Sequence, residues 1–195
     1  MSWAKRRPTL HAAAVMRPKP DTRFRIRIPE TDLASWAKEY PKEEDILAEQ
    51  IGASARERGH LLLPELRELA RWKSQRIGRR IDANRDSVVQ EVTRLALGTD
   101  DPGLAIRALQ LLDGVGWPMA SVILHFCSRE RYPVLDVRAI WTVGYDKLPS
   151  YTTTFWAAYT SYCRNLSDRT GLSMRDVDRG LWQYSDHRGK MALPR

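Results

Sequence analysis

Residues 112–116 constrain the fold more than any other segment, because they place Gly114-Val115-Gly116 between two apolar segments with helical spacing. Two glycines on either side of one apolar residue allow a tight turn with positive φ angles, and the valine can fill the core between the helices. The second helix would then begin with free backbone N–H groups at the positive end of its dipole. Such a helix start binds phosphate without any charged side chain.

Helical patterns continue along most of the chain. Apolar residues recur at three- and four-residue spacing, and proline or glycine separates one segment from the next. The clearest alternating run, residues 23–28, lies in the N-terminal region. We therefore predict an all-α fold, a compact bundle of about eight or nine helices over residues 29–190. Within it the two-helix element covers about 104–127, and a loop and helix follow at 132–144.

The positive charge of the chain is concentrated at one end. The formal net charge is +8 over 195 residues. Residues 1–27 contain eight Lys or Arg and a single Asp, a net charge of +7, which leaves +1 for the other 168 residues. We predict that residues 1–28 form a basic, largely disordered arm. The arm is either simply solvated or it neutralises phosphates and speeds association with nucleic acid.

The sequence argues against several classes of protein. No apolar run reaches the roughly 18 residues that span a bilayer, so we expect no membrane partner. Cys127 and Cys163 are far apart and have no CxxC or Cys/His spacing, so neither zinc nor an iron–sulfur cluster is expected. The expected location is the cytoplasm, with nucleoid association if the protein is bacterial, and the expected oligomeric state is a monomer.

A second motif follows the glycine turn. It reads Tyr132-Pro133-Val134-Leu135-Asp136-Val137-Arg138, and Asp136 stands 20 residues after Gly116. Together the two motifs resemble those of the helix-hairpin-helix DNA glycosylase superfamily. That family has a hairpin of the form Leu-Pro-Gly-Val-Gly-x-x-x-Ala, followed by a Pro-Val-x-Asp loop and a helix. Asp113 takes the place of the usual proline. The resemblance is good over about residues 104–144 and loose elsewhere.

The resemblance implies a role for Asp136. Breaking an N-glycosidic bond builds positive charge on the sugar, and a carboxylate near the anomeric carbon stabilises that charge or activates the attacking water. Asp136 would be this catalytic residue. Asp136 can also be the N-cap of the next helix, and the two roles are compatible.

Other family features bear on the reaction and on ions. Strand-cleaving members carry a lysine two residues after the second hairpin glycine, where this chain has Pro118. The resemblance therefore implies base excision without lyase activity and without a required cofactor. It also implies a structural K⁺ or Na⁺ ion at the hairpin, bound by the backbone carbonyls of Gln110, Leu112 and Val115.

Further residues are candidates for contacts with double-stranded DNA. At the hairpin they are Gly114, Val115, Gly116 and Trp117. Residues 71–80 hold five basic and no acidic residues. There we expect Lys73 and Arg76 to contact phosphates, Trp72 to stack on an extruded base and Gln75 to fill the gap in the duplex. The alternative is that Trp72 belongs to the core and the basic residues are a solvated helix end. A Schiff-base role for Lys73 is a weaker hypothesis.

Two more residues complete the predictions. Arg138 is expected to contact a DNA phosphate, with a surface salt bridge as the alternative. His125 lies on the apolar hairpin helix and is expected to be a core histidine with a satisfied hydrogen bond.

Three functional hypotheses follow. The first is a monofunctional DNA glycosylase of base excision repair, a hydrolase that releases a damaged or modified base. The second is a non-catalytic helix-hairpin-helix DNA-binding protein. The third is an all-helical domain unrelated to DNA. The step from fold to reaction rests on analogy.

Overall fold

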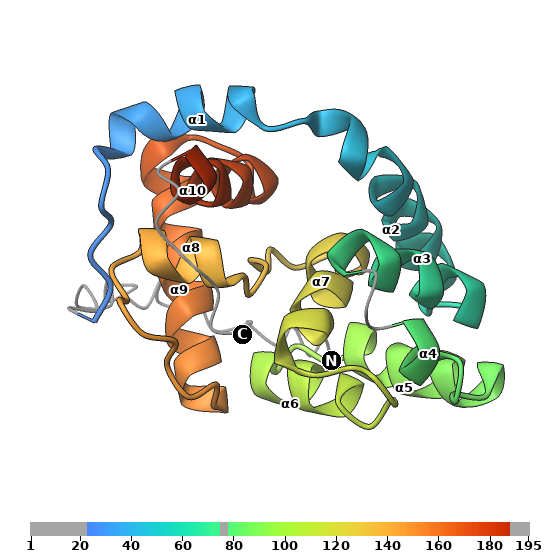
Figure 1. Ribbon diagram of the computed structural model, residues 1–195. Helices are drawn as coiled ribbons and strands as arrows, with labels where there is room; N and C mark the ends of the chain where they lie inside the picture. Colours follow the sequence, from blue (N-terminus) through green and yellow to red (C-terminus); the bar gives the residue numbers. More distant parts are fainter. Residues whose placement is uncertain (1–22, 75–77, 188–195) are drawn as a thin grey trace, which may run out of the picture.

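The computed structural model describes residues 23–74 and 78–187, and this part of the chain contains helices, turns and loops but no strand (Figure 1). The all-helical fold class is therefore confirmed. The helices are α1 (Leu33–Glu39), α2 (Ile46–Arg58), α3 (Leu63–Lys73), α4 (Gly78–Ile81), α5 (Asp86–Gly98), α6 (Pro102–Leu109), α7 (Trp117–Cys127), α8 (Val137–Thr142), α9 (Thr153–Thr170) and α10 (Met174–His187). Within the described ranges, no helix has the length and apolarity that crossing a membrane requires.

The helices form two groups, one around α10 and one around α7. On one side α1 and α8 pack against α10, which also contacts α9, and on the other α2, α3 and α6 pack against α7 (Figure 1). α6 also contacts α9, which joins the groups. α7 is apolar almost all round, and its residues from Met119 to Leu124 are all buried. A helix with this composition is stable only inside a core. The packing of α2, α3 and α6 around α7 provides that core.

Local signals explain where the helices near the turn begin. The Asp101 carboxylate accepts the Leu104 N–H at 2.6 Å, and Pro102 occupies the first turn of α6. Pro118 occupies the first turn of α7. Proline is suited to this position because the N–H it lacks would have no partner inside the helix.

Residues 23–28 correct the predicted boundary of the N-terminal arm. Phe24 and Ile28 are buried, and Phe24 packs among aromatic rings that include Phe155 and Tyr162. The Arg25 N–H donates to the Val143 carbonyl at 2.8 Å, and the Arg27 N–H donates to the Thr142 carbonyl at 2.9 Å. This stretch therefore belongs to the folded domain, because its alternating pattern turns Phe24, Ile26 and Ile28 toward the core and leaves the residues between them exposed. Residues 1–22 of the arm lie outside the described residues.

Candidate functional site

The chain connects α6 to α7 through a tight turn at the position that the sequence predicts. Gly114 has a φ of +80°, in the left-handed region that favours glycine. A Cβ atom at Gly114 would lie 3.0 Å from the Cβ of Arg80 and 3.2 Å from the backbone nitrogen of Ile81. Both the backbone angle and the close approach of α4 therefore require glycine at this position.

Asn84 holds the turn in place from outside. Its side-chain oxygen accepts the Asp113 N–H at 2.9 Å, and its side-chain nitrogen donates to the Asp113 carbonyl at 2.9 Å. The same nitrogen donates to the Ile81 carbonyl. Asn84 therefore fixes the turn to the end of α4, and sequence reasoning missed it because the two partners are 29 positions apart.

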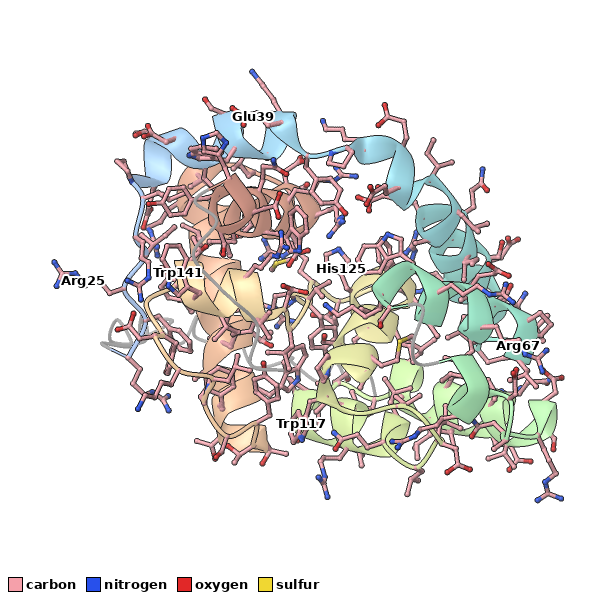
Figure 2. All side chains as sticks on the ribbon, in the orientation of Figure 1. Arg25, Glu39, Arg67, Trp117, His125 and Trp141 are labelled. Carbon is pink, nitrogen blue, oxygen red and sulfur yellow. The ribbon has the colours of Figure 1, made fainter. Side chains whose placement is uncertain are left out.

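The remaining turn residues divide between core and surface. Val115 is buried, as we expect of a residue that fills the space between the helices. Its N–H donates to the Leu112 carbonyl at 3.1 Å, so this carbonyl has one lone pair left for an ion. Trp117 begins α7 and is partly buried, in the lower part of the molecule in Figure 2, and the Arg107 guanidinium lies 5.9 Å from the centre of its ring.

Asp136 caps the helix that follows. Its Oδ1 accepts the Arg138 N–H at 2.9 Å, the N-cap interaction that satisfies one free donor of α8. Its Oδ2 accepts from Lys73 Nζ at 2.6 Å. The cap uses one carboxylate oxygen, and the second faces a lysine from the C-terminal end of α3.

The pair of Lys73 and Asp136 is partly accessible. The side chains are 13% and 20% exposed, respectively. Burial on its own would raise the pKa of Asp136, but the charge and hydrogen bond of Lys73 and the Arg138 N–H hold this pKa below its ordinary value. Asp136 is therefore a carboxylate at neutral pH, which stabilising a positively charged sugar requires.

A buried network of charges lies beside this pair. The Asp45 carboxylate, which precedes α2, is fully buried and accepts from the Arg175 guanidinium at 2.7 Å and from Arg179 Nε at 2.8 Å. Trp72 Nε1 also donates to Asp45, at 3.2 Å. Because Trp72 precedes Lys73, the network connects α10 to the end of α3 that carries the lysine.

Trp72 packs within this network and is partly buried. Its ring makes an edge-to-face contact with Phe126 at 5.0 Å, and the Arg175 guanidinium lies 5.2 Å from the ring centre. These contacts favour the alternative interpretation, a packing role. The neighbouring candidates Gln75 and Arg76 lie outside the described residues.

Arg138 and His125 both have protein partners. Arg138 forms an ion pair with Asp186, and its guanidinium lies 4.5 Å from the centre of the Trp182 ring. His125, in the middle of the molecule in Figure 2, forms a hydrogen bond with the Tyr132 carbonyl through Nδ1 at 2.6 Å. Burial, with a smaller effect of the charge of Arg175, lowers the pKa of His125 to about 3. His125 is therefore neutral, a partly buried residue with a satisfied hydrogen bond.

Tyr151 adds a phenol near the pair. Its hydroxyl is buried and has no hydrogen-bond partner among the described residues. Burial, together with the charge of Asp136, raises its pKa to about 12, so the hydroxyl keeps its proton. Over the same residues, no group of three His, Cys, Asp or Glu side chains is placed to hold a metal ion. The chemistry of the site is thus that of one carboxylate, one amine and a neutral phenol.

Comparisons with protein-family models, with curated proteins and with solved structures give no match.

Proposed function

We propose that this chain binds double-stranded DNA and hydrolyses the N-glycosidic bond of a damaged or modified base. The observation that carries the proposal is Asp136, an ionised and partly exposed carboxylate held by Lys73 at the start of α8. The glycine turn before α7, whose Gly116 stands 20 residues before Asp136, would supply the phosphate-binding helix start that the reaction needs.

In the proposed reaction the start of α7 binds the DNA and Asp136 acts on the sugar. The start of α7 would hold a backbone phosphate and so fix the DNA relative to α8. The bond between C1′ and the base nitrogen breaks, and its electron pair leaves with the base. The Asp136 carboxylate stabilises the positive charge on the sugar while a water molecule adds to C1′ and releases a proton. The product is an abasic site in an intact strand.

The experiment that tests the proposal is a base-release assay on a panel of duplexes, each with one damaged or modified base. We expect the purified protein to release the base from at least one duplex and to leave an alkali-sensitive abasic site. Salt-sensitive duplex binding with no base release across the panel would instead identify a non-catalytic DNA-binding protein. The absence of both would contradict the proposal and favour a helical domain unrelated to DNA.

Lys73 favours a second candidate function, a strand-cleaving lyase. Its amine lies 2.6 Å from Asp136, although the chain has Pro118 where strand-cleaving glycosylases carry their lysine. Once deprotonated, Nζ could attack C1′ in place of water, and the base would leave with the electron pair of the broken bond. The C1′–O4′ bond would then open as Nζ forms a double bond to C1′, and O4′ would take the proton that Nζ lost on attack. The resulting Schiff base would lose a C2′ proton and expel the 3′ phosphate.

Borohydride distinguishes the two functions, because it reduces a Schiff base to a stable amine cross-link. If Lys73 is the nucleophile, we expect the wild-type protein to become cross-linked to the duplex from which it releases the base. Without borohydride it should cleave the strand of that duplex. Lys73→Arg keeps a cation beside Asp136 but cannot form a Schiff base, so this variant should lose the cross-link, the strand cleavage and the base release that depends on attack by Lys73. A wild-type protein that releases base without any cross-link would exclude the lyase and leave the hydrolase.

A further inference from the structure

A second carboxyl group, Asp178, lies in the electrostatic field of the candidate site. It belongs to α10, which packs against α8, the helix that Asp136 caps. The Asp178 side chain is 6% exposed, and its Oδ2 accepts from Arg175. Its Oδ1 is buried and has no hydrogen-bond partner in the described part of the chain. A buried carboxyl oxygen without a partner is costly, and a bound proton lowers that cost.

The charged groups around Asp178 come from several elements. Burial has the largest effect and raises the pKa of Asp178 to about 6, while Arg175 and Lys73 lower it and Asp136 and Asp45 raise it. The neighbouring groups on α9 and at the end of α1 are neutral. They are the thiol of Cys163 and the phenols of Tyr159 and Tyr40, all with raised pKa values. Asp178 therefore keeps its proton to a higher pH than an ordinary aspartate does.

The pKa values of Asp136 and Asp178 are thus shifted in opposite directions. Asp136 is held as a carboxylate by Lys73 and by the N–H of α8. Asp178 has one oxygen on Arg175 and the other without a partner. Two carboxyl groups whose surroundings shift their pKa values in opposite directions are the usual arrangement for cleaving a glycosidic bond. One carboxyl group donates a proton and the other stabilises positive charge.

We propose that Asp178 is the proton donor to the departing base, an inference that rests on the proposed base release. As the bond between C1′ and the base nitrogen breaks, its electron pair moves to the base. The base then takes the proton on Oδ1 of Asp178, directly or through one water molecule. Arg175 stabilises the carboxylate that remains. The water that adds to C1′ releases a proton to solvent, and Asp178 regains its proton from solvent.

The test compares pH profiles of single-turnover base release for the wild type and for Asp178→Asn. In the wild type the rate should fall as the pH rises above about 6, because the donor loses its proton. Asn keeps an acceptor for Arg175 but has no acidic proton, so Asp178→Asn should be about 10²-fold slower at pH 6 and should lack this fall. Asp178→Glu should restore the fall with pH. Asp176→Asn, which changes a partly exposed residue two positions before Asp178, should match the wild type.

The leaving base supplies a second readout that a purely structural role of Asp178 would not change. A duplex with N7-methylated guanine has a base that is already positively charged and departs neutral, so Asp178→Asn should lose little on it. A duplex with hypoxanthine has a neutral base that departs as an anion unless it is protonated. On this duplex Asp178→Asn should show the whole of the expected fall in the rate of base release.

Each outcome has a distinct meaning. This inference would be overturned if Asp178→Asn kept the wild-type pH profile. It would also be overturned if the variant lost the same fraction of the base-release rate on every base that the wild type releases. Either result would leave the proposed function standing. No base release by the wild type on any duplex would overturn both. Thermal melting of the variants separates a loss of folding from a loss of proton donation. If Asp178→Asn does not fold, the pH profile of Asp178→Glu still tests the inference, because glutamate keeps an acidic proton.

Discussion

Asp136→Asn is expected to slow base release by about 10²- to 10⁴-fold, because an amide neither stabilises a positively charged sugar nor accepts a proton from water. The asparagine side chain still accepts the Arg138 N–H, so the cap of α8 should persist. Duplex affinity should therefore stay close to that of the wild type. The measurement is single-turnover base release at saturating protein, with affinity measured separately by titration.

Asp101→Asn is the matched control for this substitution. Asp101 also caps a helix, by accepting the Leu104 N–H, and it is exposed and distant in sequence from the site. Its replacement should leave the rate of base release unchanged. An Asp136→Asn variant that released base as fast as the wild type would show that Asp136 is only a helix cap.

Asp45→Asn is expected to lower the free energy of unfolding by about 3–5 kcal/mol, since it leaves Arg175 and Arg179 buried without their shared counter-charge. For a chain of this size, such a loss lowers the melting temperature by on the order of 10 °C. Thermal melting followed by circular dichroism at pH 7 measures the effect. Because Trp72 also donates to Asp45, the variant should disturb the end of α3 beside Lys73.

Asp146→Asn is the control for Asp45→Asn. Asp146 pairs with Arg27 but is 84% exposed, and exposed pairs contribute at most about 1 kcal/mol. The two variants make the same chemical change and differ in burial. If Asp45→Asn melted at the same temperature as Asp146→Asn, the buried network would have no structural role.

The dependence of stability on pH should have opposite signs for Asp45 and Asp178. Burial on its own would raise the pKa of Asp45, but hydrogen bonds and charge from Arg175, and then from Arg179, hold it below the unfolded value. The stability that Asp45 contributes is therefore present above the unfolded pKa and is lost as the pH falls through the folded pKa. The pKa of Asp178 is raised by burial to about 6. Its contribution is present below the unfolded pKa of about 4 and is lost as the pH rises through 6.

The sequence by itself determined the features that depend on neighbouring residues. Pro102 and Pro118 mark helix starts, glycine at 114 permits the turn, and Asp136 caps the helix that follows it. These signals lie within 35 positions of one another and act through backbone angles and local hydrogen bonds. They were therefore sufficient to predict the helical class, the turn and the position of Asp136.

The tertiary structure alone decided the partners of the charged residues. Lys73 and Asp136 are 63 positions apart, and Arg175 and Asp45 are 130 apart. In the sequence, Lys73 is one of five basic residues in a row of ten, and Asp178 is one of several acids on an amphipathic helix. Which of them is buried, and beside which charge, depends on how α3, α8 and α10 pack. Burial and pairing together set each pKa, and neither is encoded in local spacing.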